Sequence, residues 1–259
     1  MKEILTKETL KELKNADLRP FFITVVAAFS LTGIRFFAGA YKFDGFQCLF
    51  NGLGLHESYE KLNYYLTQSS HTEAWQLVYW AMASSAFYFI PAIVVIRLVF
   101  KDKIQNYGLK LKGMFTGWKI YVAMYIFMLP LIYLVSLNDE FLNTYPFYRI
   151  KSKADLLPYL GIWEAAYIIQ FIALEFFFRG FLVLGLKKKL GIYSICLMII
   201  PYCMIHFIKP LPECVVSIFA GLILGWMSYK TNSVIMGAML HISVALSMDL
   251  LSLWHRGLI

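Results

Sequence analysis

The chain has 259 residues, of which 59% are hydrophobic and only 15% are charged, and its formal net charge is +8. A soluble globular domain carries about 25% charged residues, so this composition excludes an ordinary soluble enzyme. It indicates a polytopic α-helical membrane protein. We expect no nucleic-acid partner, because no zinc-finger spacing or basic helix free of membrane segments is present, and we assign the positive charge to loops on the cytoplasmic side.

The N-terminal 19 residues alternate charged and apolar side chains. We expect residues 1–19 to form an amphipathic segment on the membrane surface, followed by a single transmembrane domain over residues 20–259. A signal peptide is the alternative, since Ala38-Gly39-Ala40 is similar to a cleavage site. Arg35 interrupts the apolar run before that point, which favours the amphipathic segment.

Apolar runs of about 20 residues, the length that crosses hydrocarbon, follow one another along the rest of the chain. They predict seven transmembrane helices, at about 20–40, 75–98, 114–137, 158–186, 190–208, 212–229 and 233–254. Residues 41–74 leave room for a further short or re-entrant segment. The predicted fold class is therefore all-α, a polytopic transmembrane helical bundle of about seven to eight spans.

Lysines and arginines orient this bundle. With the N-terminus in the cytoplasm, most of them fall on inner segments such as 97–119 and 187–189, and fewer fall on outer ones. This is the bias expected from the positive-inside rule. We expect an integral protein of a bacterial plasma (inner) membrane, with the lipid bilayer as its surroundings and the N-terminus cytoplasmic.

The four cysteines, Cys48, Cys196, Cys203 and Cys214, include no CxxC pair. Three of them lie in or beside apolar segments, so we expect reduced, buried thiols that pack as small hydrophobes. Cys203 lies three residues before His206 on the same helix face, which leaves half a metal site as the alternative.

Few ionisable groups lie deep in the later spans, and a chain that retains them uses them, since each costs at least about 2.5–3.5 kcal/mol on insertion scales. They are Glu175, Arg179, His206, His241 and Asp249. At about 1.5 Å per residue they fall in one central band contributed by three helices. A carboxylate and imidazoles converging from separate helices suit acid–base or metal-assisted chemistry.

Each of these residues also has a structural interpretation. Glu175 and Arg179, one turn apart, neutralise each other in a packing pair, and each histidine makes a single interhelical hydrogen bond. Asp249 lies near the end of its span and is expected at the interface. Glu164, Lys209 and Glu213 are expected to be solvated at the outer ends of their helices.

The order and spacing of three strings resemble those of a known family. The strings are Glu175-Phe-Phe-Phe-Arg179-Gly180-Phe181-Leu182, Tyr202-Cys-Met-Ile-His206, and Thr231-Asn-Ser233 leading to His241. They are similar to the motifs of the CPBP family, the CAAX-protease and bacteriocin-processing (Abi) intramembrane endopeptidases. The likeness covers a catalytic core at about residues 155–254, with a weaker likeness at 106–109.

The resemblance implies an intramembrane endopeptidase with a catalytic set of Glu175, Arg179, His206 and His241. His206 corresponds to the water-activating histidine, His241 to the oxyanion-side histidine, and Arg179 to the structural partner of Glu175. The resemblance also implies a metalloprotease in which His206 and His241 hold a divalent metal such as zinc. The substrate would be a hydrophobic or lipidated peptide or a membrane protein.

Two positions depart from the family pattern. Leu174 stands where the family has its first glutamate, and Ala245 stands where it has an Asn or Asp. Glu175, Glu213 and Asp249 are candidates to replace the missing groups. The alternative is a catalytically degenerate membrane protein on the same scaffold, with a bacteriocin self-immunity, chaperone or regulatory role.

Overall fold

The structure is a computed structural model that describes residues 17–150, 153 and 156–259. Within those residues the chain is helical and has no strand. Six helices are long and apolar enough to cross a membrane, over Arg19–Phe37, Thr72–Val99, Trp118–Val135, Leu156–Leu190, Leu211–Thr231 and Ile235–His255. The all-α bundle that the composition predicts is therefore confirmed.

The helices follow one another with short connections. The first half of the chain contains α2 (Arg19–Phe37), η1 (Ala40–Phe46), α3 (Gln47–Gly52), α4 (His56–Thr67), α5 (Thr72–Val94), η2 (Val95–Val99), η3 (Ile104–Tyr107), α6 (Trp118–Val135) and α7 (Asp139–Thr144). The second half contains η5 (Leu156–Leu160), α8 (Gly161–Glu175), η6 (Phe176–Leu184), α9 (Gly185–Leu190), α10 (Tyr193–Met204), α11 (Leu211–Thr231) and α12 (Ile235–His255).

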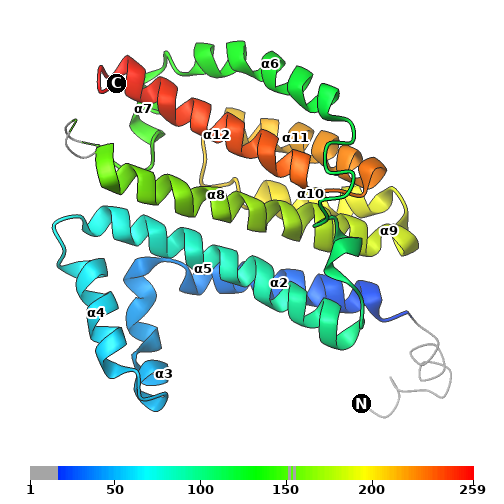
Figure 1. Ribbon diagram of the computed structural model, residues 1–259, viewed down its shortest axis with the longest axis horizontal. Helices are drawn as coiled ribbons and strands as arrows, with labels where there is room; N and C mark the ends of the chain where they lie inside the picture. The colour runs from blue at the N-terminus through cyan, green and yellow to red at the C-terminus, as the bar shows by residue number, and fades with distance from the viewer. Residues whose placement is uncertain (1–16, 151–152, 154–155) are drawn as a thin grey trace.

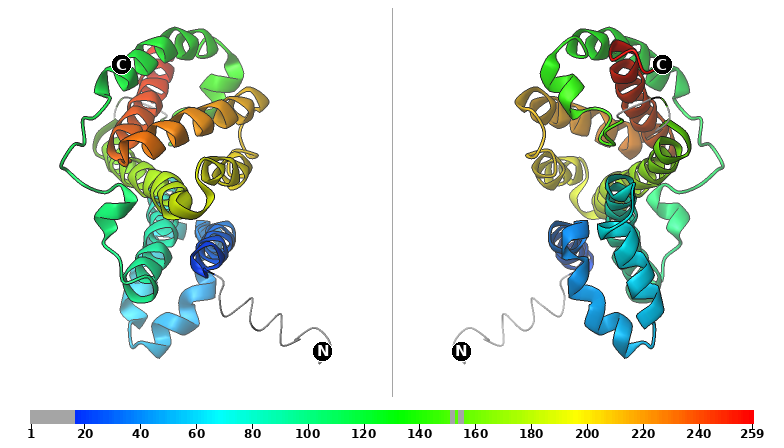
Figure 2. Two further views of the ribbon diagram at one scale, coloured as in Figure 1. Left: turned by 90° about the vertical axis from the view of Figure 1, so that its right-hand side faces the viewer. Right: turned by 90° about the vertical axis from the view of Figure 1, so that its left-hand side faces the viewer.

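The span Leu156–Leu190 is the central rod of the bundle. Its apolar window is 83% buried, against 11% for Trp118–Val135 and 39% for Ile235–His255. In Figure 1, α5 and α2 lie on one side of α8, and α12 followed by α6 lies on the other. Figure 2 shows α10 and α11 packed on the same rod from a third direction. Residues on this rod are thus shielded from lipid by the other helices.

The predicted span 190–208 is shorter in the structure. The helix α10 covers 12 residues, Tyr193–Met204, which is about 18 Å at 1.5 Å per residue and less than the hydrocarbon thickness. Gly191, with a φ of 53°, separates it from α9, and turns over 205–208 end it ahead of Pro210. Only the middle of this apolar run is therefore α-helical, and it packs on α11.

Residues 41–74 do not hold another crossing helix. They form the short helices η1, α3 and α4, which project from the end of the α2–α5 pair (Figure 1). Phe43, Tyr59 and Leu66 form a small core of their own there. The amphipathic segment predicted at 1–19 lies outside the described residues apart from 17–19, where α2 begins at Arg19.

Candidate functional site

Glu175 and Arg179 lie at the junction where the central rod changes from α-helix to π-helix. Glu175 is the last residue of α8 and Arg179 belongs to η6, and both side chains are fully buried. Nη1 of Arg179 is 3.1 Å from Oε1 of Glu175. The ion pair that the spacing suggested is present, and it occupies the π-helical geometry that concentrates at functional sites.

The helix α12 brings His241 to the same carboxylate. Nδ1 of His241 is 3.1 Å from Oε1 of Glu175, and its ring centroid is 4.4 Å from that of Phe171. The side chain of His241 is 19% exposed, whereas Glu175 is closed off. Oε2 of Glu175 has no hydrogen-bond partner among the described residues, and it lies against Gly237, where an added Cβ would approach within 3.1 Å.

His206 joins the cluster through Tyr202. The guanidinium carbon of Arg179 lies 4.0 Å above the ring of Tyr202, and that ring meets the ring of His206 edge-on at 4.9 Å. Nδ1 of His206 is 2.8 Å from the carbonyl oxygen of Tyr202. The structure therefore gathers Glu175, Arg179 and His241 in direct contact, with His206 adjoining them.

Tyr202 is a site residue to which sequence reasoning assigned no role. It is buried, and it separates the Arg179 guanidinium from the His206 imidazole. The sequence signal for Tyr202 is its spacing from His206. An aromatic residue four positions before a histidine lies about one helical turn away on the same face of the helix.

The two departures from the family pattern are both filled by packed apolar side chains. Leu174 is 8% exposed and belongs to the main core cluster with Phe177 and Phe178. Ala245 is also 8% exposed and packs in a second cluster with Tyr167. Neither position offers a polar atom to the site.

Lys209 and Glu213 are not solvated as expected. Their side chains are 16% and 24% exposed and lie 3.7 Å apart. The hydroxyl of Tyr145 donates to Oε2 of Glu213 and accepts from Nζ of Lys209, each at 2.7 Å. Tyr145 follows α7 and is brought over the α10–α11 turn by the connection to α8, so it covers both groups.

Asp249 is buried between helices. It is 4% exposed and its carboxyl group lies near that of Glu164 on α8; Oδ1 of Asp249 and Oε2 of Glu164 are both buried with no hydrogen-bond partner among the described residues. Asp249 lies eight residues beyond His241 on α12, about 12 Å along the helix. Asp249 is thus paired with Glu164, and Glu213 is held by Tyr145 and Lys209; whether either replaces a missing group beside Glu175 stays a prediction.

The segment 106–109 fixes the position of η6. The carbonyl oxygen of Tyr107 packs on Gly180, where an added Cβ would lie 2.4 Å from it. The carbonyl oxygen of Gly108 accepts a hydrogen bond of 3.2 Å from the backbone N–H of Val234, just before α12. The weak upstream likeness at 106–109 thus has a structural role, because this segment ties the helix of Arg179 to the helix of His241.

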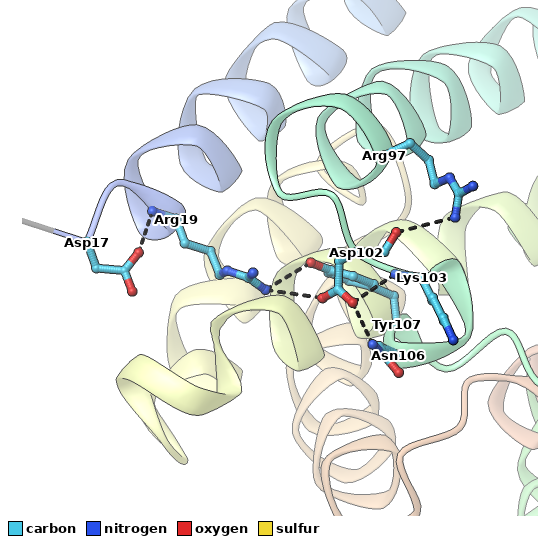
Figure 3. A network of polar contacts seen from close by, with 7 residues as sticks. All are labelled: Asp17, Arg19, Arg97, Asp102, Lys103, Asn106 and Tyr107. Atoms are coloured by element: carbon cyan, nitrogen blue, oxygen red, sulfur yellow. Dashed lines mark hydrogen bonds and ion pairs between the residues drawn. The ribbon is translucent and has the colours of Figure 1, made fainter.

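A network of polar contacts holds the segment 106–109 in place (Figure 3). Nη1 of Arg19 donates to Tyr107 Oη at 3.1 Å and lies 3.5 Å from the Asp102 carboxylate. The same carboxylate accepts from the backbone N–H of Lys103 at 2.8 Å and from Asn106 at 2.5 Å. Partial burial acts to raise the pKa of Asp102, but these hydrogen bonds outweigh it and the pKa is lowered.

The residues described do not fit a zinc site. No group of three or more His, Cys, Asp or Glu side chains in residues 17–150, 153 and 156–259 is placed to hold a metal ion. A catalytic zinc takes three protein ligands. His206 and His241 offer one free ring nitrogen each, while Oε1 of Glu175 is engaged by Arg179 and His241. Zinc stays a prediction of the resemblance alone.

The comparisons with known proteins agree with these motifs. Residues 157–247 match the family model described as type II CAAX prenyl endopeptidase Rce1-like. Neither a curated protein nor a solved structure matches the chain. The matched stretch contains Glu175, Arg179, His206 and His241. The match covers residues 157–247 only, and it is consistent with the resemblance to the CPBP family.

Proposed function

We propose that the protein is an intramembrane endopeptidase that hydrolyses a peptide bond at or within the bilayer. The observation that carries this proposal is the contact of 3.1 Å between Glu175 Oε1 and His241 Nδ1, made between α8 and α12. A carboxylate on Nδ1 favours the tautomer with its N–H toward the carboxylate and leaves Nε2 as a base. Hydrolytic triads use the same arrangement of an orienting carboxylate and a histidine base.

His206 offers a second nitrogen to the same reaction. Its Nδ1 donates to the Tyr202 carbonyl, which leaves Nε2 free to accept a hydrogen bond from water. In the proposed step, His206 orients the water and His241 takes its proton as the oxygen attacks the peptide carbonyl carbon. Glu175 stabilises the resulting imidazolium, which then gives the proton to the leaving amine. The base is thus His241, although the resemblance assigned water activation to His206.

The proposed enzyme is slow. Ala245 stands at the position where the resemblance expects an oxyanion donor, and it is buried among apolar side chains. Loss of one such donor costs about a hundred- to a thousandfold in rate. We propose a hydrophobic or lipidated peptide, or a membrane protein, as the substrate. The reason is that the partly exposed side chain of His241 belongs to a bundle of apolar spans.

A catalytically degenerate role is the second candidate. It is favoured by Leu174 and Ala245, which both replace polar residues of the family pattern and are both packed in apolar clusters. On this alternative the same scaffold binds a peptide without cleaving it and acts as a self-immunity factor, chaperone or regulatory subunit.

The test is cleavage of defined peptides by the purified protein in lipid vesicles. The probes are quenched-fluorescence hydrophobic peptides with and without an S-prenylated cysteine. We expect wild-type cleavage that is lost in Glu175→Gln, His206→Ala and His241→Ala. His255→Ala is the matched control, because His255 bonds Ser136 at 3.0 Å and lies outside the cluster. Peptide binding without any cleavage by the wild type would support the degenerate role and contradict the endopeptidase.

A further inference from the structure

Two thiols face each other beside the candidate site. Sγ of Cys203, near the end of α10, is 3.9 Å from Sγ of Cys214, in the first turn of α11. Both side chains are half-buried, whereas Cys48 and Cys196 are exposed. The expectation of buried thiols is therefore wrong for Cys196, which lies in an apolar segment, while Cys203 and Cys214 form a pair.

We propose that Cys203 and Cys214 form an intramolecular disulfide bond. A disulfide has a sulfur–sulfur distance of about 2.05 Å, so the two sulfurs must approach by about 1.9 Å from their 3.9 Å contact. Rotation about each Cα–Cβ bond moves a sulfur over that range. The helices need no large displacement, because α10 and α11 already pack along each other.

The oxidant is itself a disulfide, carried by a small thiol compound or by an oxidoreductase. The thiolate of one cysteine attacks a sulfur of that disulfide and releases one oxidant thiol. The second cysteine then displaces the other oxidant thiol and closes the bond. The protein loses two protons and two electrons, and the oxidant is reduced to two thiols.

The pair lies at the end of the bundle where disulfides persist. At its other end α11 meets α9, since Nζ of Lys187 donates to the carbonyl of Tyr229 and to Asn232. The run Lys187-Lys188-Lys189 marks that end as cytoplasmic by the positive-inside rule. The α10–α11 turn is therefore on the outer side, where oxidising conditions hold.

The bond would close a short ring around the loop that carries His206. The backbone N–H of His206 donates to the carbonyl of Cys203 at 2.9 Å, and that of Lys209 donates to the carbonyl of His206 at 2.8 Å. Both residues lie between the two cysteines, so the disulfide restrains the turn that presents His206 to Tyr202. This inference stands without the proposed hydrolysis, because the bond itself is measurable.

The experiment is thiol mapping of the full-length protein. Membranes are prepared without reductant, free thiols are blocked with N-ethylmaleimide, and the digested protein is analysed by mass spectrometry. We expect a cross-linked species containing Cys203 and Cys214, lighter by two hydrogen atoms than the two thiol peptides. Oxidised glutathione should increase it and dithiothreitol should abolish it. Cys203→Ser should release Cys214 to maleimide, while the control variants Cys48→Ser and Cys196→Ser should keep the bond.

The result that would overturn the proposal is complete maleimide labelling of both Cys203 and Cys214 after exposure to oxidised glutathione. Exposed Cys48 serves as the internal standard, because its glutathionylation in the same sample shows that the oxidant was active. A disulfide that instead links Cys48 to Cys203 or Cys214 would equally contradict the pair.

Discussion

At the scale of single residues, Glu175 contacts two other residues of the candidate site. One oxygen, Oε1, meets both the guanidinium of Arg179 and the imidazole of His241, and the Glu175 side chain is fully buried. Removing one partner of a buried ion pair costs about 3–5 kcal/mol, because an uncompensated charge remains. Glu175 therefore stabilises the fold as well as orienting His241.

Glu175→Gln tests this double role. We expect the variant to be destabilised by about 3–5 kcal/mol, since Arg179 stays buried without its counter-charge. The measurement is thermal unfolding in detergent, followed by circular dichroism. Arg179→Met combined with Glu175→Gln should recover part of the loss, because an apolar side chain needs no partner. Wild-type stability of Glu175→Gln alone would mean that the pair contributes nothing.

The carboxyl pair of Glu164 and Asp249 makes a second prediction. Asp249→Asn should retain wild-type stability, because the amide N–H can donate to Glu164. Asp249→Ala should destabilise the protein by about 1–3 kcal/mol, since it leaves a largely buried carboxyl group of Glu164 without that partner. Thermal unfolding of the two variants in the same detergent distinguishes them, and equal melting temperatures would contradict the pairing.

These residues show which parts of the site can be predicted from the spacing of residues along the sequence. The strings around Glu175, Arg179, His206 and His241 can be found in the sequence because each is local to one helix. The partner of Asp249 is not local: Glu164 is on α8 and Asp249 is on α12. The bond from Tyr145 to Glu213 joins residues 68 positions apart. Depth along a span predicts neither contact, because rotation and tilt of packed helices decide them.

At the scale of elements, the central rod depends on a close backbone contact. The π-helix η6 presents Gly180 to the carbonyl of Tyr107 in η3, with no room for a methyl group between them. Apolar periodicity predicts the long helix but not its π-helical section, because every residue from Phe176 to Leu184 is buried. Because this segment is apolar on every face, its sequence has no polar–apolar periodicity that could indicate a change of helical pitch.

Gly180→Ala tests the contact. The added Cβ would lie 2.4 Å from the Tyr107 oxygen, so η3 must move away from η6. We expect a loss of about 1–3 kcal/mol, the usual cost of overpacking a rigid core. Gly45→Ala is the matched control, because a Cβ there has nothing within 4 Å. Equal thermal unfolding of the two variants would show that η3 does not hold η6.

The network of Asp102 adds a pH dependence at the same junction. Its folded pKa is lowered from 3.8, so its contribution to stability is fully present above that value and is lost as pH falls through the lower folded pKa. Melting temperatures measured from neutral pH down to about pH 3 should fall less steeply for Asp102→Asn than for the wild type. Asp139→Asn, at an exposed position of α7, is the control that should keep the wild-type slope.

At the scale of the whole molecule, hydropathy locates the spans but not their neighbours. Six of the predicted spans correspond to long apolar helices, since each has the length that a bilayer requires. The run 190–208 is apolar as well but forms a shorter helix, because a glycine before α10 and turns after it limit its length. Burial of the central rod arises from packing between segments that are distant in the sequence. Hydropathy averaged over a short stretch of sequence therefore does not predict it.

The orientation of the molecule is the last prediction. We expect the N-terminus in the cytoplasm, which places the α4–α5 connection outside and the loop before α6 inside. Single-cysteine variants of a cysteine-free protein test this, with Ser70→Cys in the first loop and Lys112→Cys in the second, both exposed positions. A membrane-impermeant maleimide applied to intact cells should label the first and spare the second until the cells are lysed. Reversed labelling would place the turn with Cys203 and Cys214 in the cytoplasm, where thiols stay reduced, and would remove the basis for their disulfide.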